Sequence, residues 1–141
     1  MSTQATMEGP SFQPIEMSFP LPKHPHLNFH AHMSCLGNCV MIHLTTTDLD
    51  QSHTSVPPLG SFVYAMPHLR HDSTAISTPL ITSGSSIDYA TRMAKILARR
   101  MRQPVYVGCS MNFAGTTAEE EMEGLTVAVT EIMRQWNERK S

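Results

Sequence analysis

The stretch that decides the fold is HLNFHAHMSCLGNCVMIHLTTT, residues 26–47. Residues 26–33 alternate between polar and apolar side chains, which is the period of a strand with one buried face. The apolar set is Leu27, Phe29, Ala31 and Met33, and the polar set is His26, Asn28, His30 and His32. Gly37-Asn38 is a turn signal, and a β-branched, apolar run follows it from Cys39. Residues 26–47 are therefore predicted to form a hairpin.

Three more strand signals lie on the C-terminal side of this hairpin. Residues 61–66 form a strand-like run that Pro67 ends, because proline cannot donate a hydrogen bond to a sheet. The next β-prone run contains Pro79, which restricts it to an edge or an early end. Residues 105–111 read as a further strand. Hairpin signals dominate, so the sheet is predicted to be mainly antiparallel.

Two amphipathic helices interrupt and follow these strands. The first is expected to begin at the N-cap Ser85, with Asp88 as its capping partner, and to stop before Pro104. The second is expected to begin near Thr117, with Glu120 as its partner. Each helix has an apolar stripe that needs a face to bury. The predicted fold is therefore an α+β two-layer sandwich, with a mainly antiparallel sheet and two amphipathic helices on one face.

The length of 141 residues suits a single domain. Residues 1–22 contain four prolines and show no sustained period, so we expect a flexible N-terminal tail. Residues 23–141 are then the single folded domain. Residues 48–60 are polar, end in a proline-rich run and are expected to form a surface loop.

Composition excludes several classes of protein. Hydrophobic residues make up 40% of the chain, charged residues 16%, and the net charge is −2, so it is globular and not a polybasic nucleic-acid binder. We find no apolar run of about 18 residues that could cross a membrane and no signal peptide. Three cysteines without a framework spacing favour reduced thiols, and we expect the protein in the cytoplasm and the nucleus.

Histidines on the first strand raise the question of a metal site. Alternate strand residues project together, so His26, His30 and His32 are the candidate ligands, with His43, Cys35 and Cys39 as candidate further ligands. No acidic residue lies close in the sequence. We therefore favour a solvated or partner-facing polar strand face and expect no metal or cofactor. The alternative is a histidine-strand metal-binding module or small enzyme.

The chain offers no convincing nucleophile. A Gly-x-Ser-x-Gly elbow is missing, and Cys109 lies within a buried-looking strand where its thiolate is not favoured. The serine-rich segment 83–86 could cradle an anion at a helix start, but an ordinary helix cap explains it. We therefore expect that the protein is not an enzyme.

The stretches YAMPHLRHDSTAISTPL (64–80) and IDYATRMAKILARRMRQPVYVGCSM (87–111) resemble the proteasome assembly chaperone 4 family. The likeness consists of a Pro-His-Leu-Arg corner after a strand, a helix rich in Leu-Ala-x-Arg, and a Gln-Pro-Val-Tyr-Val strand. These positions are Pro67, His68, Leu69 and Arg70; Leu97, Ala98 and Arg99; Gln103, Val105, Tyr106 and Val107. The likeness extends over about residues 26–138. The tail of residues 1–22 and the 48–60 loop look longer than this family needs.

The resemblance implies a chaperone that pairs with assembly chaperone 3 as a heterodimer. It implies that the pair promotes formation of the α ring of the 20S proteasome by binding near the α5 subunit, without a cofactor. Arg70 is then expected to bond backbone carbonyls or a carboxylate at the corner. The expected exposed sheet surface is the alternating strand 27–33 and the run 62–66. The partner-binding candidates are Phe62, Tyr64, Met66, His68, Arg70, Arg92, Lys95 and Arg99.

The charged helices offer a second kind of surface. The first helix carries five basic residues against Asp88 alone, and the second begins with four glutamates. A solvated face is the default interpretation of such charge runs. A docking surface is the alternative, because complementary charges steer proteins toward one another.

Overall fold

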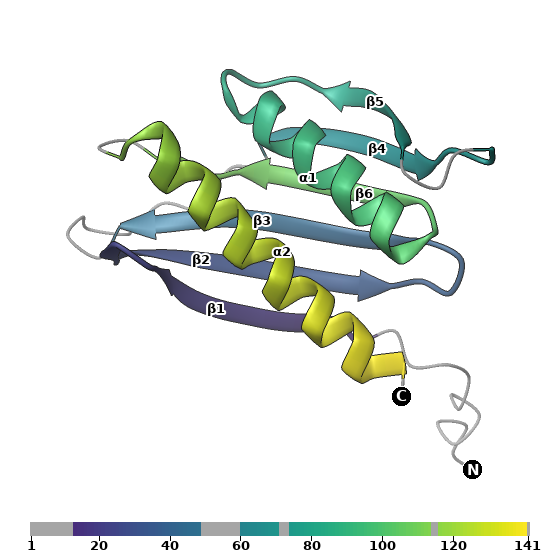
Figure 1. Cartoon of the computed structure of the whole chain (residues 1–141), viewed down its shortest axis with the longest axis horizontal. Helices are drawn as coiled ribbons and strands as arrows, with labels where there is room; N and C mark the ends of the chain where they lie inside the picture. Colours follow the sequence, from purple (N-terminus) through teal and green to yellow (C-terminus); the bar gives the residue numbers. More distant parts are fainter. Residues whose placement is uncertain (1–12, 49–59, 71–73, 114–115, 141) are drawn as a thin grey trace, which may run out of the picture.

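The computed structural model describes residues 13–48, 60–70, 74–113 and 116–140. Within these residues the elements follow one another as shown in Figure 1. They are β1 (Ile15–Leu21), β2 (His24–Cys35), β3 (Val40–Asp48), β4 (Ser61–Pro67), β5 (Ala75–Ile81), α1 (Ser86–Met101), β6 (Val105–Ser110) and α2 (Ala118–Lys140). No helix among the described residues is long and apolar enough to cross a membrane. The expected loop at 48–60 lies largely outside the described residues.

The predicted hairpin is confirmed. β2 and β3 pair antiparallel from Cys35 opposite Val40 to Leu27 opposite Asp48. Gly37 in the turn has a φ of 94°, a backbone conformation that suits glycine. The apolar residues of β2 are buried, and its histidines and Asn28 are half-buried on the other side. The alternation in the sequence therefore assigned the two faces of β2 correctly.

The six strands form one sheet in the order β1-β2-β3-β6-β4-β5. All neighbouring pairs are antiparallel except β3 and β6, which run parallel. The chain reaches β6 through α1, as a parallel neighbour requires a long crossover. β5 lies at the sheet edge, as Pro79 predicted. Its partner β4 ends at Pro67.

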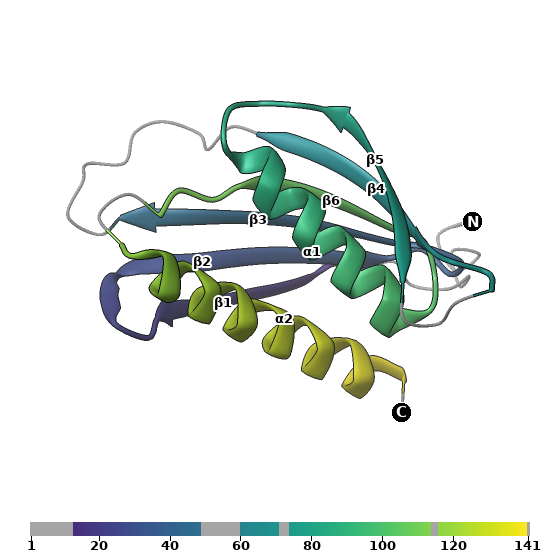
Figure 2. The same cartoon turned by 45° about the horizontal axis from the view of Figure 1, so that its top comes forward.

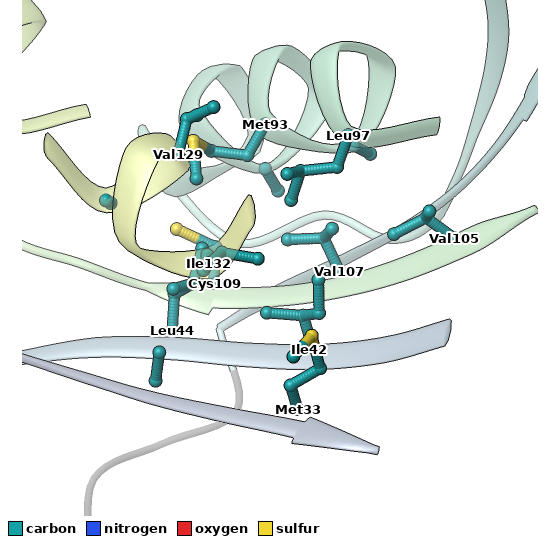
Figure 3. Close-up of a cluster of buried hydrophobic side chains, with 14 of the residues drawn as sticks. Met33, Ile42, Leu44, Met93, Leu97, Val105, Val107, Cys109, Val129 and Ile132 are labelled. Atoms are coloured by element: carbon teal, nitrogen blue, oxygen red, sulfur yellow. The ribbon is translucent and has the colours of Figure 1, made fainter. Parts of the chain in front are cut away.

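Both helices cover the same face of this sheet, so the predicted α+β two-layer fold is confirmed (Figures 1 and 2). α1 packs over β4, β5 and β6, and α2 packs over β2. Figure 3 shows Met93 and Leu97 of α1 and Ile132 of α2 directed at the sheet residues beneath them. These side chains are fully buried. Fully burying a side chain of this size stabilises the fold by about 1.5–3 kcal/mol, so this layer holds the fold together.

The predicted tail boundary is wrong. Residues 15–21 form the edge strand β1, which pairs antiparallel with β2 from Ile15 opposite Met33 to Pro20 opposite Asn28. Met17 and Leu21 are buried beneath the helix layer. An alternation at 15, 17, 19 and 21 was the missed signal, because the nearby prolines obscured it. An edge strand tolerates proline, since one side of its backbone needs no partner.

The two predicted helix starts differ in outcome. At α2 the Thr117 N–H donates to Glu120 Oε1 over 2.9 Å, and the Glu120 N–H donates to Thr117 Oγ1 over 3.2 Å. This reciprocal pair confirms the capping box. At α1 the predicted box is wrong, because the Ser85 side chain makes no capping hydrogen bond. Ser86 instead donates to the Ser83 carbonyl over 2.6 Å.

Candidate functional site on the open face of the sheet

The side of the sheet opposite the helices is called the open face here. It is made by the residues that alternate with the buried ones along each strand. Strand pairing places on it Glu16, Ser18, His30, His32, Met41, His43, Thr45, Phe62, Tyr64, Met66, Ile76, Ile81, Tyr106, Gly108 and Ser110. No described segment covers this face in Figure 2. It is the largest surface of the sheet that is left for a partner.

One row of this face crosses the sheet at Gly108. His43 and Phe62 both lie opposite Gly108 on the strands that flank β6. Their rings are stacked, with centroids 6.2 Å apart and planes 4° apart. Two rings on non-adjacent strands can meet in this way because the glycine between them has no side chain. His32 continues the row, with its ring centroid 6.3 Å from that of His43.

Aromatic and aliphatic side chains fill the half of the open face over β4, β5 and β6. Tyr106 lies 5.8 Å from Phe62 and 4.8 Å from Tyr64, measured between ring centroids. At the edge, Ile76 is 51% and Ile81 47% exposed. Isolated exposed apolar residues are normal, but a contiguous apolar patch on a sheet face marks an interaction site. This half of the open face can therefore bury apolar surface against another protein.

The half over β1, β2 and β3 is polar and internally bonded. His30 lies between two hydroxyls, with Nδ1 3.0 Å from Ser18 Oγ and Nε2 2.8 Å from Thr47 Oγ1. Ser110 Oγ donates to Thr45 Oγ1 over 3.0 Å. A hollow of about 510 Å³ lies over this half and reaches Gly108. The hollow can accept side chains from a partner.

The electrostatics of the open face depend on its histidines. Burial, and after it the neighbouring His32, lowers the pKa of His43 below its ordinary value of 6.5. Neither the His32 ring nor the His43 ring has a hydrogen-bond partner among the described residues. Glu16, opposite His32, is the carboxylate of this row. His43 is therefore neutral at physiological pH, which favours burial against a partner.

Comparison with known proteins bears on this surface. The family model of proteasome assembly chaperone 4 matches residues 28–111, which is more than half of the chain. The chain belongs to the proteasome assembly chaperone 4 family. A search of curated proteins finds no match. Among solved structures, a chain described as "Crystal Structure of a Novel Chaperone Complex for Yeast 20S Proteasome Assembly" has a TM-score of 0.61 at 15% identity. The match covers 89% of this chain and 94% of that one, and shows the shared fold.

The matched region of the proteasome assembly chaperone 4 family contains most of the open face. It runs from β2 through β6 and includes the row at Gly108 and the aromatic half. β1 and α2 lie outside it, although both belong to the sheet and its helix layer here. The family is one of chaperones rather than of enzymes. The proteasome assembly chaperone 4 assignment thus agrees with a surface built for contact with proteins.

The histidines of the alternative metal site make other contacts in this structure. His30 uses both ring nitrogens with hydroxyls, as described above. His26 faces the His24 ring, and His24 in turn pairs with Glu120 of α2 over 2.9 Å. No group of three metal-ligating side chains is present in the described part of the chain. In this member of the proteasome assembly chaperone 4 family, the described histidines of this strand therefore lie along a sheet face without gathering as a group of three.

The remaining chemical candidates have structural roles. Burial raises the pKa of the Cys109 thiol to about 11, so the thiolate is not favoured. Ser61 Oγ lies 2.8 Å from Ser86 Oγ and accepts from the Ser83 N–H over 2.9 Å, which ties the start of α1 to β4. Tyr89 donates to Glu121 over 2.6 Å in the adjoining hollow. That carboxylate would repel an anion at the serine segment.

The predicted partner-binding residues fall on two separate surfaces. Phe62, Tyr64 and Met66 lie on the open face. Arg92, Lys95 and Arg99 lie on the solvent side of α1, in the opposite layer. The structure therefore splits one predicted set into a sheet surface and a helix surface.

His68 and Arg70 form the corner after β4. The Arg70 N–H donates to His68 Nδ1 over 3.1 Å, and the His68 N–H donates to the Thr74 carbonyl over 3.2 Å. Arg70 is exposed, and no carbonyl or carboxylate among the described residues accepts from its guanidinium. The expected role of this side chain in bonding the corner is therefore not seen among the described residues, where the corner contacts come from the backbone and the His68 imidazole.

Part of the open face was missed at the sequence level. The 27–33 alternation was expected to contribute to the exposed surface, and it does so through its histidines, while its apolar residues are buried under the helices. Met41, His43 and Tyr106 were also not selected as partner-binding residues. Alternation within β3 and β6 could have assigned them to one side of their strands. The pairing order that brings them beside Phe62 had no local signal.

Proposed function

We propose that the protein acts in proteasome assembly as a heterodimer with assembly chaperone 3, and that the pair promotes formation of the 20S α ring by binding near the α5 subunit. Membership of the proteasome assembly chaperone 4 family supports this proposal. The similar fold of a chain from a chaperone complex for yeast 20S proteasome assembly also supports it. The proposed location is the cytoplasm and the nucleus. The protein is proposed to have no catalytic activity and no cofactor.

The observation that carries the pairing is the uncovered open face. A two-layer fold buries one side of its sheet and leaves the other to solvent or to a partner. Here the half of the second side over β4, β5 and β6 presents stacked Phe62 and Tyr106, with Tyr64 beside them. Two sheets pack face to face about 10 Å apart with their inner side chains interdigitated. A partner of the same fold can supply such a second sheet.

Co-purification tests this function. The full chain is expressed with assembly chaperone 3 and the α5 subunit, and masses are measured by light scattering on a sizing column. A one-to-one pair and a ternary complex are expected. The double variant Phe62→Glu/Tyr106→Glu is expected to weaken pairing by about 100-fold or more, because it places two charges in the centre of an apolar interface.

The matched control for this double variant is Lys23→Glu. Lys23 is exposed on the turn between β1 and β2 and is 3.9 Å from Glu123. The Lys23→Glu substitution changes the charge of the chain but lies outside the aromatic half of the open face, so pairing is expected to stay unchanged. Melting temperatures of all variants show whether each is folded. A wild-type chain that stays monomeric beside both partners would contradict the proposed function, and full pairing by the folded double variant would contradict the open face as its site.

Pairing through the open face is expected to weaken as the pH falls. Covering His43 removes water from a ring whose pKa is already lowered by burial. The paired state then binds fewer protons than the free chain once the pH falls to the lowered pKa of the free His43 ring, so association is at full strength above that pKa and weakens progressively below it. One proton changes the dissociation constant by at most about tenfold per pH unit. Sizing experiments from about pH 7.5 to about pH 5.5 measure this dependence.

The variant His43→Gln isolates the contribution of that ring. It keeps a polar side chain at the position and removes the titration, so the pH dependence of pairing is expected to flatten. Tighter pairing at the lower pH would instead mean that the partner places a carboxylate against His32 and His43. That result would overturn the expected sign while leaving the pairing itself intact.

A further inference from the structure

A groove runs between the two helices, on the side of the molecule opposite the open face. It has a volume of about 200 Å³. Ile96 of α1 and Leu125 and Val129 of α2 give it an apolar lining. Leu125 and Val129 are 3% and 6% exposed, so they form its floor, while Met122 at its rim is 48% exposed. The groove can take up an apolar side chain.

Basic residues line the α1 side of this groove. They are Arg92, Arg99 and Arg100. Lys95 joins them on the exposed side of α1, where Lys95, Ile96 and Arg99 line a second hollow of about 260 Å³ beside β5. The helix itself carries one carboxylate, Asp88, in its first turn. The apolar groove is thus bordered by a ridge of positive charge.

This ridge has few carboxylates of its own. Among the described residues, Arg92, Lys95 and Arg100 form no ion pair, and the Arg92 guanidinium lies 2.7 Å from the Met122 sulfur. On α2, in contrast, Arg134 is bracketed by Glu131 and Glu138. Arg134 thus has glutamates three and four residues away, whereas Arg92, Lys95 and Arg100 of α1 have no carboxylate partner among the described residues.

We propose that this groove binds an acidic segment of a protein, whose carboxylates pair with Arg92 and Arg100 and whose apolar side chain enters between the helices. Arginine forks recognise carboxylates through paired hydrogen bonds, and such pairs gain strength beside apolar surface. The exposed Met122 can adapt to the shape of the bound side chain. This site is independent of the proposed pairing, because it lies on the opposite layer and stays accessible when the open face is covered.

A protein segment fits the groove better than a nucleic acid does. The floor is apolar, and a phosphate backbone offers nothing to fill it. The net charge of the whole chain is −2, which gives no long-range attraction for a polyanion. The first turns of α2, next to the groove, carry Glu119, Glu120, Glu121 and Glu123, which would repel an extended phosphate chain.

Selection of peptides provides the test. The full chain is presented to a phage-displayed library of random dodecapeptides, and bound peptides are enriched over successive rounds. The selected peptides are expected to be enriched in Asp and Glu beside Leu, Ile, Phe or Met. The best peptide is then synthesised with a fluorescent label, and its affinity is measured by anisotropy. Added salt is expected to weaken binding, since exposed charges are screened.

Variants of the chain assign the binding to the groove. Arg92→Glu/Arg100→Glu is expected to weaken peptide binding by about tenfold or more, whereas the control Lys23→Glu leaves it unchanged. Thr130→Trp fills the groove from an exposed position without changing the charge, and it is expected to weaken binding as well. Melting temperatures near that of the wild type show that the variants are folded.

Three outcomes would overturn the proposal. The first is a selection that yields no acidic consensus. The second is a selected peptide that binds the folded Arg92→Glu/Arg100→Glu and Thr130→Trp variants as well as the wild type. The third is competition by single-stranded oligo(dT) at concentrations like that of the peptide, which would make the ridge a nucleic-acid surface. Pairing with assembly chaperone 3 is measured separately and does not depend on any of these results.

Discussion

Replacing Gly60 with alanine is expected to lower the free energy of unfolding by about 4 kcal/mol, an exceptionally large effect for one methyl group. Gly60 has a φ of 75°, and a Cβ at this position would lie 2.1 Å from the Cys109 carbonyl oxygen and 2.8 Å from Ser110 Cα. Both atoms belong to the backbone of β6, which is hydrogen-bonded on both sides. The clash therefore cannot be relieved by rotating a side chain. Urea unfolding, followed by the fluorescence of the single tryptophan, measures the loss.

Gly84→Ala is the matched control for this substitution. Gly84 also has a positive φ, 57°, but no atom lies within 4 Å of the Cβ that would be added. Only the backbone cost of a left-handed alanine applies there, about 1–2 kcal/mol. A similar loss at the two positions would mean that backbone strain, and not the contact with β6, explains the effect at Gly60.

Trp136→Ala is expected to cost about 3–5 kcal/mol, the range for removing a large aromatic side chain from a core. Trp136 is 6% exposed and continues the buried stripe of α2 after Leu125, Val129 and Ile132. This stripe is the apolar side of the helix that covers the β1–β2 side of the sheet (Figure 1). Removing its last member leaves a cavity that the sheet cannot close. Because the variant has no tryptophan, its unfolding is followed by circular dichroism.

Two further variants serve as controls for Trp136→Ala, one for a change on the exposed side of α2 and one for the loss of the aromatic ring. Thr130→Ala changes an exposed residue on the same helix and is expected to alter stability by less than about 0.5 kcal/mol. Trp136→Phe keeps an aromatic ring and is expected to recover much of the loss. If Trp136→Ala changed stability by no more than Thr130→Ala, the C-terminal half of α2 would not contribute to the core, in conflict with its burial.

Local patterns in the sequence determined most of the individual elements. The alternation over 26–33 and the Gly37 turn specify the β2–β3 hairpin, because strand period and turn conformation depend on neighbouring residues. Apolar residues that recur with the 3.6-residue period specify both helices, because this period also depends on neighbouring residues. Thr117 and Glu120 specify the start of α2, since the capping box is closed within one turn. Sequence alone could therefore give the α+β class and one covered face.

Local sequence patterns gave wrong predictions for segments whose hydrogen-bond partners lie far away in the chain. The sequence of β1 resembled a tail because Pro20 and the prolines on either side of the strand match a linker, and only its pairing with β2 shows that an edge position accepts Pro20. The box at Ser85 is not formed, and the neighbouring Ser83 and Ser86 bond to Ser61 of β4. Both regions are tied to segments that no local pattern identifies.

The candidate site depended even more on tertiary structure. Sequence marked Phe62 and Arg92 as members of one partner-binding set, but it could not place them on opposite layers. Nor could it place His43 beside Phe62, because that contact needs β6 between their strands and Gly108 at the crossing point. Sequence by itself determined which side chains share a face of one strand, since that follows from the period of the backbone. Tertiary structure decided which strands lie side by side and which face the helices leave open, since long-range pairing and packing set both.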